Sequence, residues 1–100
     1  MPVHGNSRKN NKDHHLYAIF DEKEDDIFKY GISDKPVDIR GSSARMREQV
    51  SFLNRAVGWV RYFARIILTG IKGRDKARDL EDEYIDKYKK ENGRHLRGNL

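Results

Sequence analysis

Short apolar runs alternate with polar connectors in the first third of the chain. Residues 15–20 (HLYAIF) and 27–33 (IFKYGIS) are rich in β-branched and aromatic side chains, and a wholly charged segment, DEKEDD, separates them. Two runs of this kind around a short polar connector are typical of an antiparallel hairpin. We therefore expect two strands, followed by a polar loop over residues 34–41 in which Pro36 interrupts regular structure.

The apolar spacing changes from a strand period to a helix period after residue 41. Apolar side chains recur at i, i+4, i+7 and i+11, which places them on one face of a helix. They are Met46, Val50, Leu53 and Val57. Either Ser42 or Ser43 can cap the start of this helix, and Gly58 can end it.

Residues 59–68 (WVRYFARIIL) are the longest strand candidate. Their β-branched and aromatic content favours a strand over a buried helix. Strict alternation would place Val60, Tyr62, Ala64, Ile66 and Leu68 on one face. Arg61 and Arg65 would lie on the other face, which suits a sheet with one partly wet side. Gly70 and Gly73 would then bracket a turn.

A second helix is predicted over residues 75–91, with the pair Asn92-Gly93 as its stop. The resulting order, β-β-α-β-α, predicts an α+β fold in which a small three-stranded antiparallel sheet is flanked by helices. We expect this domain over residues 14–100. Residues 1–13 are expected to form a flexible basic arm, which either lies along a phosphate backbone or is an untethered terminus.

One acidic residue of the second helix faces the apolar side. At about 100° per residue, with Ala77 at zero, the apolar stripe extends from Leu80 at about 300° to Ile85 at about 80°. Glu81 lies at about 40°, inside that stripe. A carboxylate buried against a sheet is costly unless a positive charge pairs with it. That partner is either an arginine, in a structural ion pair, or a metal cation that Glu81 would bind.

The charge balance indicates a polyanionic partner. Lys and Arg number 21 against 16 acidic residues, which gives a formal net charge of +5. Such a surplus on a small domain favours nucleic acid first and an anionic membrane surface second. The chain has no cysteine, no apolar run long enough to span a membrane and no secretory signal. It also has no P-loop, GxGxxG or GxSxG motif, which argues against a nucleotide cofactor and against serine hydrolysis.

Several basic side chains are candidates for phosphate contacts. Arg45, at the start of the first helix, can fork onto a phosphate, although a solvated arginine is the simpler alternative. His15 enters the first strand and could reach a phosphate, or it forms a solvated pair with His14. Arg61 and Arg65 add to the basic surface that a nucleic acid would contact.

Five short segments resemble the motifs of the GIY-YIG (URI-type) endonuclease domain, especially the small versions found as C-terminal toxins of bacterial polymorphic secretion systems. LYAIF resembles the GIY strand, with Tyr17 as its tyrosine. KYGIS resembles the YIG strand, with Gly31 and Ser33 matching. The resemblance covers about residues 14–100 and follows the same order of elements.

The helical segments resemble the charged motifs of that family. RMREQ, beginning at Arg45, is similar to the catalytic-arginine segment, and ARDLEDEYI has Glu81 in the place of the metal-binding glutamate. Asn99, in RGN, resembles the terminal asparagine, and Asn92 is the alternative that is nearer in spacing. Because Asn92 precedes Gly93 in the helix stop, we favour Asn99.

The chain departs from the family pattern at two positions. Leu16 stands where the GIY strand has its leading glycine, and Lys29 stands where the second tyrosine normally lies, two residues before the glycine. Tyr30 comes one residue later. Either Tyr30 is a core residue and Lys29 replaces a catalytic hydroxyl, or the strand bulges and brings Tyr30 to the site.

The resemblance implies a metal-dependent endonuclease that hydrolyses phosphodiester bonds, with DNA favoured over RNA. Glu81 would bind the divalent metal, Mg²⁺ first and Mn²⁺ second. Tyr17 would help to activate the attacking water, and Arg45 would steady the scissile phosphate. Lys29 and Ser33 would be further nucleic-acid contacts.

The same resemblance implies that the chain is the toxic domain of a larger secreted effector and acts in the cytoplasm of a target cell. The producing cell would protect itself with an acidic immunity protein that covers the basic cleft. Two other functions fit the same residues. One is a non-catalytic nucleic-acid-binding module, and the other is a protein-interaction domain with an acidic partner.

Overall fold

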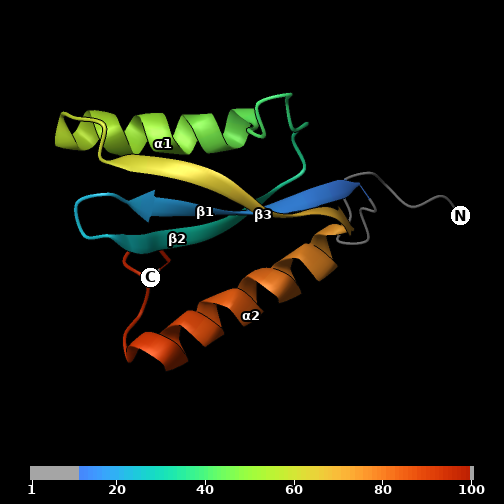
Figure 1. Ribbon diagram of the computed structural model, residues 1–100. Helices are drawn as coiled ribbons and strands as arrows, with labels where there is room; N and C mark the ends of the chain where they lie inside the picture. Colours follow the sequence, from blue (N-terminus) through green and yellow to red (C-terminus); the bar gives the residue numbers. More distant parts are fainter. Residues whose placement is uncertain (1–11, 100) are drawn as a thin grey trace, which may run out of the picture.

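The computed structural model describes residues 12–99, in which three strands and two helices follow the predicted order (Figure 1). They are β1 (Asp13–Asp21), β2 (Asp26–Ser33), α1 (Ala44–Val57), β3 (Tyr62–Lys72) and α2 (Arg74–Asn92). The α+β prediction is therefore confirmed. Most of the predicted arm, residues 1–11, lies outside the described residues, and Asp13 already belongs to β1.

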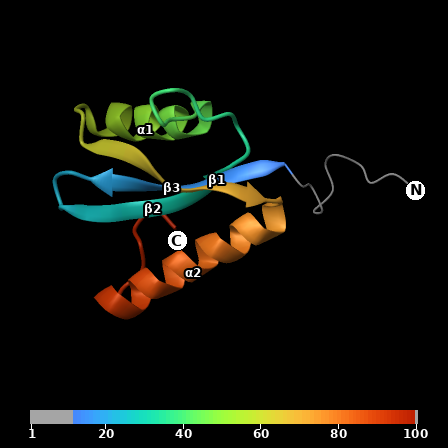
Figure 2. The same ribbon diagram turned by 45° about the vertical axis from the view of Figure 1, so that its right-hand side comes forward.

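The sheet has the strand order β2-β1-β3 and is antiparallel throughout. Figures 1 and 2 show α1 on one face of the sheet and α2 on the other. β1 is the central strand and is covered on both faces. Leu16 and Ala18 pack on the α2 side, and Tyr17 and Ile19 pack on the α1 side, each no more than 1% exposed. This double burial explains why the HLYAIF segment is apolar at almost every position.

Both helices bury the stripes that their spacing predicts. Ser43, not Ser42, caps α1, because its side chain accepts the backbone N–H of Met46, and Gly58 ends α1 in the left-handed conformation. Val57 is the exception, since it is 37% exposed in the last turn. The apolar residues of α2 all join the core, namely Ala77, Leu80, Tyr84, Ile85 and Tyr88. No helix within residues 12–99 has the length and apolar character needed to cross a membrane.

The third strand starts and ends later than predicted. It begins at Tyr62 rather than Trp59, because the Asn54 side chain binds the backbone N–H groups of both Arg61 and Tyr62 and the carbonyl of Tyr62. These bonds hold the connector after α1 in a turn. At the other end, Gly70 lies within the strand instead of in a turn, and pairing continues to Lys72.

The predicted alternation along this strand was also wrong at one point. Ile66 pairs with Tyr17, whereas Leu68 pairs with Leu16, the neighbouring residue of β1. Neighbouring strand residues face opposite sides of a sheet, so Ile66 packs beneath α1 and Leu68 beneath α2. Ile67 is the extra residue of a bulge, which the apolar pattern does not reveal.

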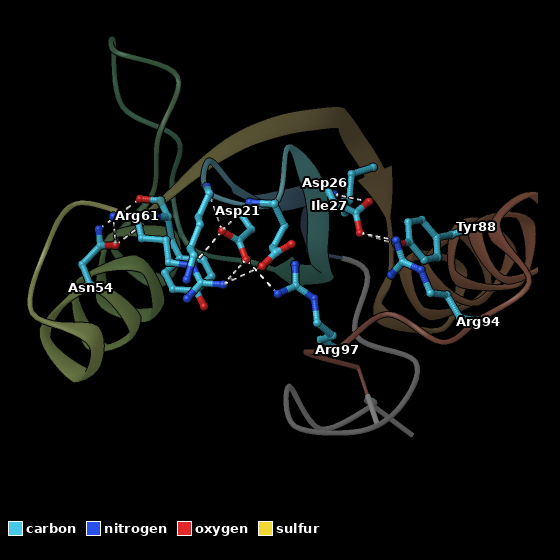
Figure 3. Close-up of polar contacts among 11 residues, drawn as sticks. Asp21, Asp26, Ile27, Asn54, Arg61, Tyr88, Arg94 and Arg97 are labelled. Carbon is cyan, nitrogen blue, oxygen red and sulfur yellow. Dashed lines mark hydrogen bonds and ion pairs between the residues drawn. The ribbon is translucent and has the colours of Figure 1, made fainter.

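Ion pairs join the turn of the β1–β2 hairpin to segments that are distant in the sequence (Figure 3). The buried Asp21 carboxylate accepts two bonds from Arg61, at 2.8 and 2.7 Å, and a third from Arg97, at 2.8 Å. Nearby, Asp26 accepts bonds from Tyr88 and Arg94. These contacts tie the hairpin to the start of β3, to the end of α2 and to the segment that follows α2.

Candidate active site

A cleft of about 480 Å³ lies beside the edge strand β2. Residues from Lys29 to Ser33 form part of its lining, and both helices contribute side chains from either face of the sheet. The helix residues are Arg45 and Gln49 from α1 and Arg74, Arg78 and Glu81 from α2. The structure thus gathers Tyr17, Arg45 and Glu81, which come from three separate elements, around one space.

Gly31 allows Tyr17 to reach this cleft. The two residues pair across β1 and β2, and a Cβ atom on Gly31 would lie 2.5 Å from the Tyr17 hydroxyl oxygen. The tyrosine ring therefore occupies the space that any side chain at residue 31 would fill. Its hydroxyl donates a 2.6 Å hydrogen bond to Oε1 of Gln49. A glycine within a strand often marks a place where another group approaches closely, and at Gly31 that group is the Tyr17 side chain.

The Tyr17 phenol is protonated at neutral pH. Burial raises its pKa above the ordinary value of 10.0, and the charge of Glu81 raises it further, while the guanidinium of Arg45 opposes the shift. The single O–H donor is committed to Gln49, and the guanidinium of Arg45 donates a hydrogen bond to the same oxygen, which helps to oppose the rise in pKa. One lone pair of the oxygen is therefore left to accept a hydrogen bond from a water in the cleft.

Glu81 is a partly buried carboxylate with no ion-pair partner among residues 12–99. Burial is the main cause that raises its pKa above 4.5, and Asp82 adds to the effect, while Lys29 and Arg78 oppose it. The arginine-paired core glutamate is therefore not what the structure shows. Within the described part of the chain, no three His, Asp or Glu side chains form a metal cage. A single carboxylate in an open cleft fits a hydrated Mg²⁺, which keeps several waters and binds few protein ligands.

The geometry of β2 separates the roles of Lys29 and Tyr30. The irregularity in the β1–β2 pairing lies between Ile19 and Phe20, so residues 29–31 alternate regularly. Tyr30 faces α2, where it is 7% exposed and packs edge-on against Tyr84. Lys29 lies on the Tyr17 side and lines the cleft, and burial lowers its pKa while Glu81 opposes that shift. Tyr30 is thus a core residue, and Lys29 lines the same cleft as Tyr17.

The positive charges of the cleft extend along both helices. Arg45 is exposed and forms no ion pair among residues 12–99, in contrast to Arg47, which binds Asp38 at 2.6 Å. On α2, Arg74 and Arg78 also line the cleft. Neither arginine was among the residues predicted from the sequence, although their spacing to Glu81 indicates a shared face, because i, i+4 and i+7 fall on one side of a helix.

The family comparison agrees with this geometry. Residues 7–93 match the family described as URI fold toxin 2. The chain belongs to the URI fold toxin 2 family. The URI fold is the fold of GIY-YIG-like nuclease toxins, so the chain is a toxin domain with a nuclease-like fold. Neither the curated proteins nor the solved structures gave a match.

This URI fold toxin completes its cleft with a segment that follows the matched span. The Asn99 side chain accepts the backbone N–H of Tyr30 at 2.7 Å and donates to the Tyr30 carbonyl at 2.9 Å. The amide thereby takes the place of a neighbouring strand along the free edge of β2. Asn92, by contrast, binds the Tyr88 carbonyl inside α2. As the sequence analysis favoured, Asn99 is the asparagine at the cleft.

Gly98 is what allows this segment of the URI fold toxin to lie so close to β2. Its backbone N–H donates to the Phe28 carbonyl at 2.8 Å, and a Cβ atom on Gly98 would lie 2.7 Å from the Cβ of Lys29. The segment therefore depends on glycine for its contact with the edge strand. Since both the oxygen and the nitrogen of the Asn99 amide are bonded to the backbone of Tyr30, we expect the main role of Asn99 to be to position β2.

Four other predicted contacts of the URI fold toxin lie in different settings. Ser33 lines the cleft, and its hydroxyl accepts the N–H of Lys35. His15 is 3% exposed, bonded to Ser43 at 3.0 Å, and its pKa is lowered mainly by burial, so the solvated pair was wrong. Arg61 lies before β3, bound to Asp21, and Arg65 is exposed on β3 over the Phe63 ring. Arg61, Arg65 and His15 lie outside the cleft lining, and their roles in nucleic-acid binding stay predictions.

Proposed function

We propose that this URI fold toxin is a metal-dependent endonuclease that hydrolyses phosphodiester bonds, with DNA as the favoured substrate. The observation that carries the proposal is the partly buried Glu81 carboxylate, without an ion-pair partner in the described chain, in the same cleft as Tyr17 and Arg45. A buried carboxylate that lacks a cation is costly, and a bound divalent metal would remove that cost.

The charge of the cleft suits a phosphodiester backbone. Five Lys or Arg side chains line it against two carboxylates, those of Asp34 and Glu81. Arg45 can bind two oxygens of one phosphate through its planar guanidinium, and Lys29 supplies a second positive charge on the Tyr17 side. These groups would hold a phosphate close to the Tyr17 hydroxyl.

Glu81 would hold the metal, which when bound stabilises negative charge on the phosphate and lowers the pKa of a bound water. Tyr17 would orient the attacking water, because its hydroxyl donates to Gln49 and can accept a hydrogen bond from that water. Its raised pKa favours this positioning role over a role as a free phenolate base. Gln49 fixes the direction of the hydroxyl.

The test is cleavage of plasmid DNA and of RNA with Mg²⁺, with Mn²⁺ and with a chelator. Glu81→Gln keeps the size and helix propensity of the residue and removes its charge, and Glu83→Gln on the exposed side of α2 is the matched control. We expect metal-dependent cleavage that Glu81→Gln lowers by at least about 100-fold, a typical cost of losing one charge-stabilising group. Cleavage that persists in chelator or in Glu81→Gln would contradict the metal assignment.

A non-catalytic nucleic-acid-binding module is the second candidate, because the second tyrosine, Tyr30, packs against Tyr84 while Lys29 lies on the Tyr17 side of β2. It predicts salt-sensitive binding without cleavage under any metal condition. Glu81→Gln would then tighten binding, since it removes a negative charge from the cleft. A wild type that cleaves, together with a Glu81→Gln variant that binds at least as tightly but does not cleave, would favour the nuclease. A wild type that binds but never cleaves would favour the binding module.

In its biological setting, we propose that the domain belongs to a larger secreted effector and acts in the cytoplasm of a target cell. Support comes from the toxin family and from the basic cleft, which an acidic immunity protein would complement. Expression of the domain in a bacterial cytoplasm should be toxic, and Glu81→Gln should relieve the toxicity at equal protein level. Equal toxicity of the two forms would contradict this proposal.

A further inference from the structure

A second hollow of about 340 Å³ adjoins the cleft, and its lining is largely apolar. Lys29 and Gln49 belong to both hollows, so the two are continuous along β2 and α1. The remaining lining residues are Phe28, Phe52, Leu53 and Gly98. The volume lies within the range of about 300–1,000 Å³ that is usual for small-molecule sites.

Phe52 is the most exposed aromatic side chain in this part of the molecule. It is 71% exposed, although Phe28 and Leu53 in the same hollow are partly buried. It follows Arg45 and Gln49 at the spacing i, i+4 and i+7, so the three residues form one row along α1. The row spans roughly 10 Å at a rise of 1.5 Å per residue. A cation, a polar group bonded to Tyr17 and an aromatic ring thus follow one another beside the edge strand.

We propose that this apolar hollow is a nucleobase subsite, in which the base next to the scissile phosphate stacks on the Phe52 ring. The inference rests on the proposed nuclease function. Arg45 and Lys29 would bind the phosphate, and the attached nucleotide would place its base in the adjoining hollow. Every base has an aromatic face, so stacking of this kind tolerates any sequence.

The subsite also defines the substrate class. In a duplex each base is already stacked on its neighbours and paired, so it cannot lie on Phe52 without leaving the helix. Single-stranded nucleic acid, or an unpaired nucleotide at a junction or end, can place a base there at low cost. The domain should therefore cut single-stranded or unpaired segments faster than intact duplex.

The experiment uses a single-stranded oligonucleotide with one cut position and a series in which one nucleotide near the cut is abasic. Wild type, Phe52→Ala and Phe52→Tyr are compared, with Trp59→Ala as the control for an exposed aromatic residue outside both hollows. On the intact strand, we expect Phe52→Ala to lower kcat/KM by roughly 5- to 100-fold, the cost of one base–aromatic stack. Phe52→Tyr and Trp59→Ala should stay near wild type.

The abasic series identifies the base. At one position the abasic substrate should be cut slowly by wild type, and Phe52→Ala should slow it no further, because the same contact is already absent. Penalties that add at every position would overturn the subsite while the nuclease function stands. An unchanged rate for Phe52→Ala would also overturn the subsite and leave the nuclease function standing. The exposed Phe52 ring would then be expected to contact a protein partner instead.

A binding measurement keeps this inference separate from the proposed function. If wild type cuts no nucleic acid, the nuclease proposal fails by itself. The Glu81→Gln protein is then titrated with a single strand that carries 2-aminopurine, whose fluorescence is quenched by stacking. Phe52→Ala and Phe52→Tyr are each added to the Glu81→Gln protein. The base subsite is supported if Phe52→Ala abolishes the quenching and Phe52→Tyr keeps it. Equal quenching in all three proteins overturns it.

Discussion

Two carboxylates with buried or partly buried side chains differ in their surroundings, Asp21 at the hairpin turn and Glu81 beside the edge strand. Asp21 is fully buried and bound by Arg61 and Arg97, whose guanidiniums hold its pKa well below the ordinary range. Glu81 is partly buried, has no ion-pair partner within residues 12–99, and has a raised pKa because of that burial. An inward carboxylate therefore does not by itself indicate catalysis. What distinguishes the two is whether the protein supplies the cation.

The two sites also differ in what they connect. Asp21 joins the hairpin, the start of β3 and the segment that carries Gly98 and Asn99, so the ion pairs hold distant parts of the chain together. Glu81 lines a cleft that is open to solvent, where the charges of Lys29 on β2 and of Arg78 and Asp82 on α2 act on it. We therefore expect substitutions at Asp21 to act mainly on stability, and substitutions in the cleft to act mainly on cleavage.

The largest expected effect comes from Asp21→Asn. The substitution leaves the two guanidiniums without their anion, and breaking a buried pair in this way typically costs 3–5 kcal/mol. We expect about 3 kcal/mol, the lower end of that range, because the side chains of Arg61 and Arg97 are 16% and 36% exposed. Urea unfolding followed by circular dichroism measures the loss.

The neighbouring exposed residue gives the control for Asp21→Asn. Glu22→Gln removes the same charge from the same turn and should leave the unfolding midpoint close to wild type. The Asp21 contribution should also depend on pH. Since its folded pKa is lowered, the stabilisation is complete above its ordinary value of 3.8 and is lost as pH falls through the folded value. Equal unfolding midpoints for Asp21→Asn and Glu22→Gln would contradict the claim that the ion pairs of Asp21 stabilise the fold.

The second prediction concerns the cleft and is next in size. In Gly31→Ala the new Cβ meets the Tyr17 ring, which must move away from Gln49. A displacement of about 1 Å at a reacting centre can cost about 100-fold in rate. We expect a loss of that order in kcat/KM on DNA, with the fold retained because Tyr17 can still pack beneath α1.

Gly70→Ala offers a contrast for this prediction, since Gly70 has a φ of 67° and no neighbour within 4 Å of its Cβ position. It strains the backbone away from the cleft, so it should lower stability and leave the rate of the folded enzyme unchanged. Should Gly31→Ala keep full activity, the Tyr17 hydroxyl does not need its observed place, and the proposed role of Tyr17 is wrong.

The inward position of Glu81 can be predicted from the sequence, whereas that of Asp21 cannot. Glu81 stands out because a helix repeats every 3.6 residues, which places it in an apolar stripe without any knowledge of distant contacts. Asp21 is one of several acids in a charged turn, and its partner Arg61 lies 40 residues away. Nothing local distinguishes it. For the same reason Arg61 was assigned to the basic surface, although its guanidinium is bound to Asp21.

Strand details follow the same rule. Regular alternation placed Lys29 and Tyr30 on opposite faces, and the structure agrees because the irregular pairing lies elsewhere in the hairpin. Alternation failed at Ile67, where a bulge between β1 and β3 moves Leu68 to the other face. A bulge depends on how two strands meet, so one strand alone does not encode it. The pairing of Asn99 with Tyr30 on β2 is likewise a contact between segments that are distant in the sequence.

The smallest expected effect is on stability and has the opposite sign to that of Asp21. Because burial raises the folded pKa of Glu81, its charged form destabilises the fold, and Glu81→Gln should increase the free energy of unfolding at neutral pH. The gain should not exceed about 1 kcal/mol, since solvent reaches the carboxylate and weakens the effect. Glu83→Gln, on the exposed face of the same helix, gives the reference.

The pH dependence separates this explanation from a general gain in helix stability. Below the ordinary glutamate value of 4.5 the carboxyl is protonated in both the folded and the unfolded chain, so wild type and Glu81→Gln should be equally stable. The difference should open as pH rises above 4.5 and should stay constant once the pH exceeds the raised folded pKa. A difference in stability that is already present at acid pH would arise from packing. If no difference appears at any pH, the Glu81 carboxylate lies in the cleft at no energetic cost and does not need a cation there.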